Sequence, residues 1–341
     1  MRSYLRTLIV VALAFALVAA VLYNVDLRGV LRQIVHAQPA WLALALATML
    51  VNLAIRSWRW QYLLEPLGRP SFLNAFRATA VGFAASAILP ARAGEVIRPY
   101  FLSRHERVSA TGAFATVILE RVLDTLAVLV LLALYVFFLR GDVGPDHTVA
   151  FETVKVAAGT AAVGAVGVLG VLFALAGDPA RLARAMSRLE RVLPSALAGM
   201  LARVAEKFAQ GLAVVRDPGR LCVSLLLSIP LWLSIAAGIW GVSVAFRLAV
   251  PFAGSFLLMA LLVVGVATPT PGAVGGFHYL FKFGATTFFG ASDDAAVGAA
   301  IVLHLFTLLP SLFLGLAFAA HEGVNLSGMK QLADRQESGT V

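Results

Sequence analysis

Of the 341 residues in this chain, 60% are hydrophobic and only 13% carry a charge. This composition leaves too little polar surface for a soluble globule and predicts an all-α integral membrane protein, a polytopic helical bundle. The net charge of +9 suits a lipid bilayer with an anionic inner leaflet. It does not indicate nucleic acid as a partner, because no soluble basic domain of a nucleic-acid-binding type is visible.

Six apolar runs are candidates to cross the roughly 30 Å of bilayer hydrocarbon. They lie near residues 8–23, 40–57, 110–139, 153–176, 221–246 and 293–320. Two basic residues, Arg2 and Arg6, precede the first run. We expect this run to be a retained helix rather than a cleaved signal peptide.

Two further apolar runs, 72–90 and 254–289, are interrupted by proline and glycine. Each break contains the pattern Pro-x-x-x-Gly, from Pro90 to Gly94 and from Pro271 to Gly275. Backbone released from helical hydrogen bonds cannot face lipid, so these segments should be buried or line a wet cavity. Broken helices at corresponding places in two halves mark the binding site of many transporters. We therefore expect about six full spans plus two re-entrant elements in an inverted repeat, although the motif also recurs by chance in glycine-rich chains.

The distribution of basic residues predicts the orientation. Segment 177–220 carries eight lysines and arginines, whereas segment 140–152 carries only Arg140. Positively charged short loops stay in the cytoplasm, so the first segment and both termini should be cytoplasmic. We expect one transmembrane domain over 1–325, which includes a cytoplasmic amphipathic segment over 178–217, followed by a flexible cytoplasmic tail over 326–341. Basic helices of this kind bind anionic lipid by about 1 kcal/mol per basic residue.

Three charged residues, Glu120, Arg121 and Asp124, lie in the middle of the run 110–139. Ionised groups at membrane depth cost at least a few kcal/mol, so they are expected to have a role. One interpretation is a neutralised cluster that pins helix packing, and the other is an intramembrane ion, proton or headgroup site. Both need a cation beyond Arg121, because two carboxylates and one guanidinium leave a net negative charge.

The first broken segment offers such cations. Arg92, Glu95 and Arg98 follow Pro90, and the planar guanidinium fork of arginine suits a phosphate. A helix that begins after Gly94 would also present free backbone N–H groups to an anion. The alternative is that these arginines only mark the cytoplasmic rim.

Two other polar groups are candidates for the site. Arg56 and Arg59 alternate with Trp58 and Trp60, which predicts mainly an interfacial anchor, with Arg59 kept as a candidate headgroup contact. His278 follows the second break, where a proton shuttle, a headgroup contact and a satisfied cavity group all remain open. The spacing of histidines, and the one cysteine, predict no metal site and no cofactor.

Four motifs occur in one order along the chain. They are Arg56-x-x-Arg59-Trp60, Leu89-Pro90-x-Arg92-x-Gly94-Glu95-x-x-Arg98, Glu120-Arg121-Val122-x-Asp124 and Pro269-Thr-Pro271-Gly272-x-x-Gly275. Together they resemble the flippase-like membrane domain of the lysylphosphatidylglycerol synthase/flippase family of bacteria and archaea. The resemblance covers nearly the whole chain. It implies a helical bundle with re-entrant elements that moves an amphiphilic lipid between leaflets, with the residues around Pro90, Glu120 and Pro271 lining the headgroup path.

Two departures from the family pattern bear on substrate and coupling ion. Ser86-Ala87 stands where members usually carry asparagine, and His278 stands where they usually carry glutamate. After His321 only about 20 residues remain, so we expect no synthase domain and no lysine transfer.

The sequence therefore predicts a lipid translocator of the cytoplasmic (inner) membrane, not an enzyme. Its headgroup site should include Arg92, Arg98, Glu120, Arg121 and Asp124. A phospholipid, a polyprenyl-phosphate sugar and a hopanoid are the candidate substrates. The alternatives are a membrane enzyme that acts on lipid phosphates or lipid-linked sugars, and a non-transporting scaffold of a lipid-synthesis complex.

Overall fold

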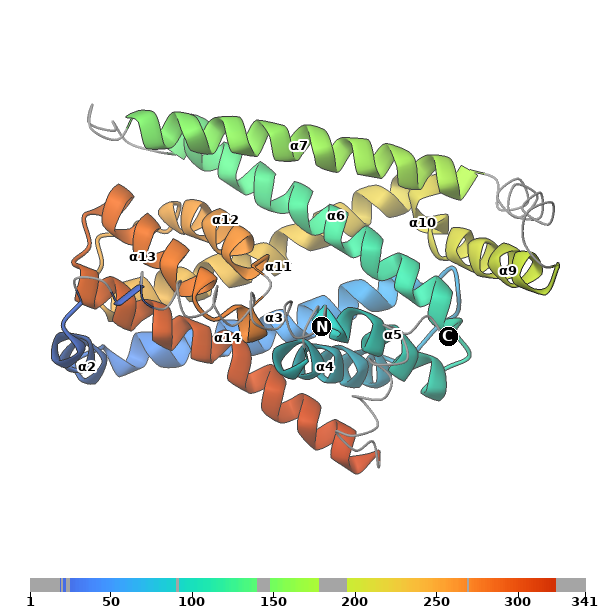
Figure 1. The fold of residues 1–341 in the computed structure, drawn as a ribbon, viewed down its shortest axis with the longest axis horizontal. Coiled ribbons are helices and arrows are strands. Elements are labelled where there is room, and N and C mark those ends of the chain that lie inside the picture. The colour runs from blue at the N-terminus through green and yellow to red at the C-terminus, as the bar shows by residue number, and fades with distance from the viewer. Residues whose placement is uncertain are drawn as a thin grey trace, which may run out of the picture.

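The computed structural model describes residues 19, 21–22, 25–89, 92–139, 148–177, 195–268 and 270–322. In this part of the chain every regular element is a helix and no strand occurs (Figure 1). The helices are α2 (Leu27–Val35), α3 (Pro39–Leu64), α4 (Phe72–Ile88), α5 (Gly94–His105), α6 (Ala110–Leu134) with a π-helical end η2 (Tyr135–Leu139), α7 (Thr148–Gly177), α9 (Ser195–Gly211), α10 (Ala213–Arg216), α11 (Pro218–Ala245), α12 (Gly254–Val266), η5 (Pro271–Ala273), α13 (Gly276–Phe289) and α14 (Asp293–His321).

Five of these helices are long and apolar enough to cross a membrane. They are α3, α6 with η2, most of α7, α11 and α14, and they confirm five of the six predicted spans. The sixth, near 8–23, lies almost wholly outside the described residues, as do 178–194 of the amphipathic segment and the tail from 326. The protein is therefore a polytopic helical membrane protein.

Local sequence signals set where the long helices begin. The Ser109 hydroxyl accepts a hydrogen bond from Gly112 N at the start of α6, and the Asp217 carboxylate accepts from Gly219 N and Arg220 N at the start of α11. Such caps satisfy N–H groups that the first helical turn leaves without partners. Pro39 opens α3 in the same way that Pro218 opens α11, at a position where the missing N–H costs nothing.

Each break separates two short helices that pack against each other. The first break lies between α4 and α5, and the second lies between α12 and α13. The two pairs lie toward opposite ends of the long axis of the molecule (Figure 1). This arrangement agrees with two re-entrant elements; that they form an inverted repeat stays a prediction.

A contact between two glycines closes each pair of short helices. A Cβ atom on Gly94 would lie 1.8 Å from the carbonyl oxygen of Gly82, and one on Gly276 would lie 2.6 Å from that of Gly265. No side chain fits at either crossing, because the obstacle in each is backbone. The glycines that follow the breaks are therefore needed for close helix packing.

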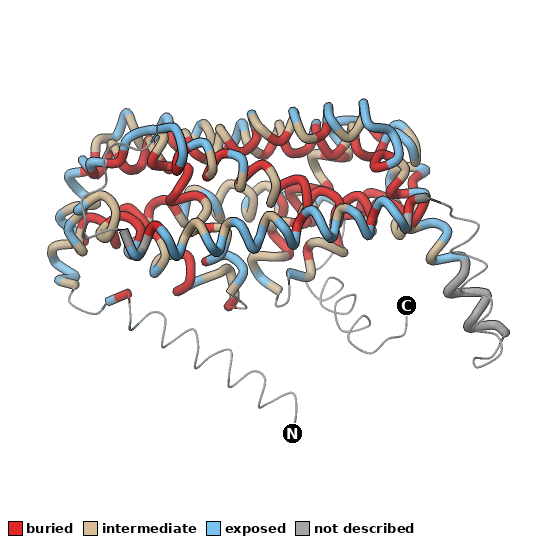
Figure 2. Tube along the Cα trace, turned by 90° about the horizontal axis from the view of Figure 1, so that it is seen from above, coloured by how far each residue is buried: buried red, intermediate tan, exposed pale blue. Residues whose placement is uncertain are grey.

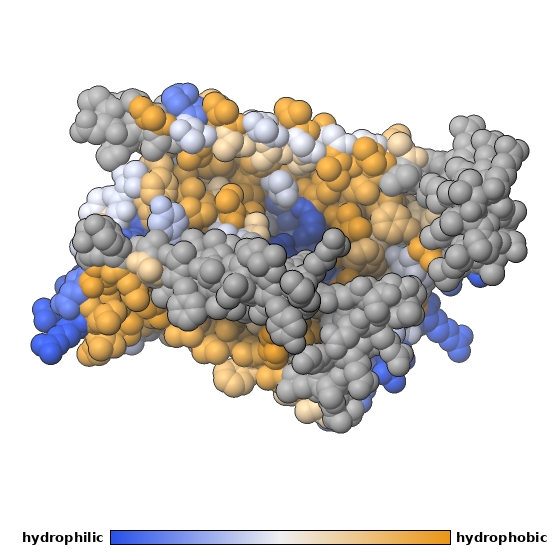
Figure 3. Space-filling model, viewed as in Figure 1, coloured by the Kyte–Doolittle hydropathy of each residue, from blue (hydrophilic) through white to orange (hydrophobic). Residues whose placement is uncertain are grey.

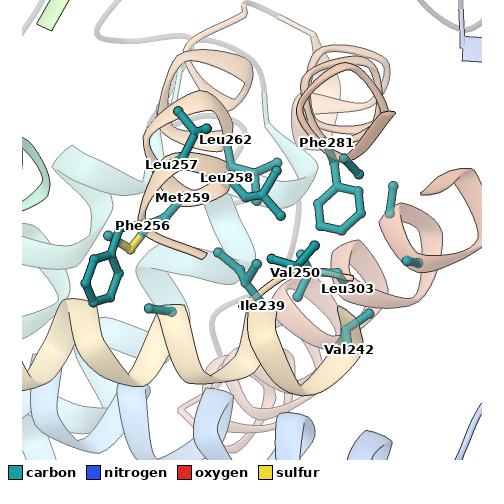
Figure 4. Close-up of a cluster of buried hydrophobic side chains, with 14 of the residues drawn as sticks. Ile239, Val242, Val250, Phe256, Leu257, Leu258, Met259, Leu262, Phe281 and Leu303 are labelled. Carbon is teal, nitrogen blue, oxygen red and sulfur yellow. The ribbon is translucent and has the colours of Figure 1, made fainter. Parts of the chain in front are cut away.

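Buried residues lie mainly on the sides of the helices that face one another, and exposed residues lie mainly on the outer sides (Figure 2). One large apolar cluster joins α11 to α12, α13 and α14 through residues such as Ile239, Leu258, Phe281 and Leu303 (Figure 4). A second cluster joins α3, α4, α5 and α6. The charged residues of α6 lie between helices from both clusters.

The described part of the amphipathic segment contacts the bundle. Helix α9 packs against the beginning of α6, and a Cβ atom on Gly211 would lie 2.2 Å from the carbonyl oxygen of Gly112. Leu212, Val214 and Val215 are buried in the second apolar cluster. The end of this segment is thus part of the helical core, while its membrane-surface role remains a prediction.

Candidate functional site

Two arginines of α3 contact the two carboxylates of α6. Arg56 Nη1 donates to Glu120 Oε1 and to Asp124 Oδ2, both at 3.1 Å. Arg59 Nη1 lies 2.7 Å from Asp124 Oδ1, and its Nη2 lies 3.3 Å from Glu120 Oε1. The side chains of Arg59 and Glu120 are fully buried. Arg56 and Arg59 are three residues apart on α3, and Glu120 and Asp124 are four residues apart on α6, so each pair lies on one face of its helix. The two faces meet, and their four side chains form one charged cluster.

The first broken segment adds a third arginine. Arg98 Nη1, from α5, donates to Glu120 Oε2 at 3.0 Å, and its guanidinium carbon lies 3.8 Å from the ring centre of Trp60. The indole Nε1 of Trp60 donates to Thr116 Oγ1 at 3.0 Å. Stacking on an aromatic ring stabilises a desolvated guanidinium by about 2 kcal/mol. Trp60 therefore holds Arg98 against Glu120.

Helix α11 closes the cluster on another side. Trp232 Nε1 donates to Asp124 Oδ1 at 3.0 Å, and Arg59 Nη1 donates to Ser228 Oγ at 2.6 Å. Together with α3, α5 and α6, the cluster thus joins four helices. Removing one partner from such a network leaves a buried charge without compensation, which is costly.

The cluster carries an excess of positive charge. Four arginines, Arg56, Arg59, Arg98 and Arg121, face two carboxylates, so the formal charge is four minus two, or +2. Arg98 meets the predicted need for a cation beyond Arg121, and α3 contributes two more guanidinium groups. Several buried donors, including Nε and Nη2 of Arg98 and Nε of Arg56, have no hydrogen-bond partner among the described residues. Buried donors without partners are unusual in proteins.

One edge of the cluster is open to the outside. The side chains of Arg121, Glu95 and Arg92 are 36%, 33% and 45% exposed. Glu95 Oε1 lies 3.7 Å from Arg92 Nη1 and 3.9 Å from Arg121 Nε. Figure 3 shows a hydrophilic recess beside the middle of α6, within an otherwise mainly apolar face. This edge therefore connects the buried charges with the apolar surface.

Arg92 also joins the two broken segments. Its Nη2 donates at 3.0 Å to the carbonyl oxygen of Val266, the last residue of α12. The backbone is left-handed at Arg92 (φ 54°) and at Ala273 (φ 57°), one in each break. This conformation costs a residue with a side chain roughly 1–2 kcal/mol. Such strain clusters at functional sites.

A histidine pair lies at the second break. His304 Nε2 donates to the carbonyl oxygen of Gly272 at 2.8 Å, and His304 Nδ1 lies 3.3 Å from His278 Nε2. The ring of His304 stacks on Phe277, with centroids 4.7 Å apart. His278 is therefore a partner of His304, which itself contacts the η5 turn, and no contact joins His278 to the arginine cluster among the described residues.

The structure brings seven predicted site residues into one connected group. These are Arg59, Arg92, Glu95, Arg98, Glu120, Arg121 and Asp124. Gly94 packs against Gly82, and Gly275 has a φ of 94° at the start of α13, so both have backbone roles. Pro90 lies outside the described residues, and Pro271 begins the η5 turn.

The interfacial interpretation of Arg56 and Arg59 is wrong. Both are at most 5% exposed, because they face two carboxylates of α6. Sequence reasoning also missed Trp232 and Ser228, whose helix α11 begins 84 residues after the end of α6. One signal in the sequence could have placed Arg56 and Arg59 at the site. The two carboxylates of α6 need cations beyond Arg121, and Arg56 and Arg59 lie one turn apart in an apolar run.

Fold and site define a polytopic helical membrane protein with a buried arginine–carboxylate cluster between two broken helical elements. The family described as "Lysylphosphatidylglycerol synthase TM region" matches residues 7–315, and the chain belongs to this family. The match confirms the resemblance of the four motifs.

Two curated proteins are similar to parts of the chain. A UPF0104 membrane protein of Methanocaldococcus jannaschii is 29% identical over 136 residues, which are 39% of this chain and 38% of that protein. The glycosyltransferase AglD of Haloferax volcanii is 26% identical over 160 residues, 46% of this chain and 25% of that protein. The matched part thus spans well under half of each relative.

Proposed function

We propose that this protein is a lipid translocator that moves an amphiphilic lipid with an anionic headgroup between leaflets. The observation that carries the proposal is the net positive arginine cluster, buried at the middle of α6 and open along one edge. In an apolar environment an excess of buried guanidinium groups is costly without an anion. A lipid headgroup supplies that anion while its tails remain in hydrocarbon.

The broken segments supply the movement in this proposal. Arg92 and Arg98 belong to the first broken element, and Val266 at the end of α12 accepts the hydrogen bond of Arg92. Alternating access in many transporters works by rocking or gating of two repeats around one fixed site. Loss of the contact between Arg92 and Val266 would let the first element open toward one leaflet and the second toward the other.

The proposal assigns no covalent chemistry to the site. Glu120 has four guanidinium groups within 4 Å, and Asp124 has three. A carboxylate so engaged is a poor general base, because protonation would leave the arginines without a counterion. We place the protein in the cytoplasmic membrane with both termini inside, on the distribution of basic residues.

The test is a leaflet assay with purified protein in liposomes. Fluorescent phospholipid, a polyprenyl-phosphate sugar and a fluorescent lipid phosphate monoester are each placed in one leaflet. Their appearance in the other leaflet is followed, and recovered lipid is analysed by mass. Movement of an unmodified lipid above the rate of protein-free liposomes is expected. Covalent change of the lipid would instead identify an enzyme, and the absence of movement of any anionic lipid would contradict the proposal.

A further inference from the structure

Glu95 is held differently from the other carboxylates of the cluster. Glu120 and Asp124 have arginine nitrogens at 2.7–3.3 Å. The nearest arginine nitrogens to Glu95 lie at 3.7 and 3.9 Å, beyond hydrogen-bond distance, and one third of its side chain is exposed. A carboxylate with only long ion pairs is easily displaced, because exposed pairs contribute about 0–1 kcal/mol.

Arginine donors surround this position. Arg92 Nη1 and Arg121 Nε both lie within 4 Å of Glu95 Oε1, and Nε of Arg121 is buried without a hydrogen bond to any described residue. Arg98, which contacts Glu120 as Arg121 does, has two buried donors without hydrogen-bond partners among the described residues. The guanidinium fork fits the oxygens of a phosphate, which has one more acceptor oxygen than a carboxylate.

The charge of the site specifies the anion further. The four arginines and two carboxylates sum to +2, and displacement of Glu95 leaves Arg92 as a further positive charge at the edge. A phosphodiester carries one negative charge, whereas a phosphate monoester carries about 1.5 to 2 at pH 7. The second class therefore offsets more of the positive charge of the site than the first.

From these three observations we propose that the edge formed by Arg92, Glu95 and Arg121 binds the phosphate monoester of a lipid, and that this phosphate displaces Glu95. The role of this phosphate site in transport rests on the proposed function, whereas the binding of the phosphate does not. Binding is measured separately, in detergent micelles without two leaflets. The shared chemistry is a doubly charged phosphate, and free phosphate and a lipid phosphate are separate arms of the test.

The experiment measures the affinity of the purified full chain in neutral micelles by calorimetry. The probes are farnesyl phosphate, its methyl ester and inorganic phosphate, of which the first two share a tail and differ by about one charge. Farnesyl phosphate should bind about tenfold or more tightly than its methyl ester, and more tightly than inorganic phosphate. Equal affinity for the two esters would overturn the charge assignment, and equal affinity for inorganic phosphate would overturn the lipid assignment.

Variants test the displacement. Glu95→Gln should tighten binding of farnesyl phosphate about three- to tenfold, because the phosphate no longer competes with a carboxylate, and Arg121→Gln should weaken it at least tenfold. Glu152→Gln, at an exposed carboxylate of α7 that pairs with Lys155, is the matched control and should change nothing. Unchanged or weaker binding in Glu95→Gln, with thermal unfolding as in the wild type, would refute the displacement.

The same lipids separate this inference from the proposed function. Selective binding of farnesyl phosphate without movement of a fluorescent monoester lipid between leaflets would keep the site and refute the translocator. Movement with no preference between monoester and diester would keep the translocator and refute the assigned phosphate class.

Discussion

Substitution of Gly94 by alanine tests whether the first broken element depends on direct backbone contact. A Cβ atom at this position would lie 1.8 Å from the carbonyl oxygen of Gly82 and 2.4 Å from Ser86 Oγ. Ordinary carbon–oxygen contacts need about 3.4 Å, so α4 and α5 would have to move apart by more than 1 Å. Overpacking of this kind costs about 1–3 kcal/mol. The upper end is expected, because a backbone carbonyl cannot rotate away.

Gly159 provides the matched control for Gly94. It lies in α7, and no atom lies within 4 Å of a Cβ built on it. In a helix interior alanine is favoured over glycine by up to about 1 kcal/mol. Gly159→Ala should therefore be neutral or stabilising, which places the two variants at least about 2 kcal/mol apart.

The assay is reversible unfolding of the purified protein in mixed micelles, followed by helical circular dichroism. The free energy of unfolding should fall in Gly94→Ala and hold or rise in Gly159→Ala. Equal free energies for the two variants, within about 0.5 kcal/mol, would show that α4 and α5 do not pack through glycine and would refute the reasoning.

Three other outcomes follow from the structure. Gly276→Ala should destabilise the protein by about 1–3 kcal/mol in the same unfolding assay, since its Cβ would meet the second element's backbone. Arg59→Gln should lower the free energy of unfolding by about 3–5 kcal/mol, because it breaks a buried ion-pair network. Arg220→Gln, at an exposed ion pair, should lower it by less than about 1 kcal/mol. Similar decreases in both variants would contradict the burial of the cluster. A hydrogen bond from His105 to a backbone carbonyl, and then its contact with Glu322, raise the imidazole pKa, while the hydrogen bond with His105 lowers the pKa of Glu322. Their ion pair should therefore be complete between about pH 4.5 and 6.5. It should be lost as pH rises through the raised pKa of His105 or falls through the lowered pKa of Glu322. His105→Gln should flatten the fall in thermal stability above pH 6.5, and an unaltered pH profile would rule out a stabilising ion pair between His105 and Glu322.

The sequence was sufficient to predict the helical bundle and both broken elements. Proline and glycine interrupt these apolar runs, and the backbone groups that they release from helical hydrogen bonds need other partners at membrane depth. The sequence alone therefore shows where the breaks lie. Glu120 and Asp124 stood out for the same kind of reason, because ionised groups in a long apolar run are expensive.

The partners of those carboxylates were less accessible. Trp58 and Trp60 look alike in sequence, yet Trp58 is 54% exposed and Trp60 is fully buried. A run of alternating tryptophan and arginine does not show which face of a helix meets protein and which meets lipid. The packing of α3 against α6 and α11 decides which face is buried. Because of this packing, the two arginines that were expected at the membrane interface lie at the centre of the site.

The most direct test of the central claim is the leaflet assay with two arginine variants compared side by side. Arg121→Gln removes a cation at the open edge of the cluster, and Arg220→Gln removes one from an exposed ion pair with Glu65. Movement of anionic lipid at the wild-type rate in Arg220→Gln and at the protein-free rate in Arg121→Gln is the predicted result. Equal rates in both variants and the wild type would show that lipid does not pass the arginine cluster.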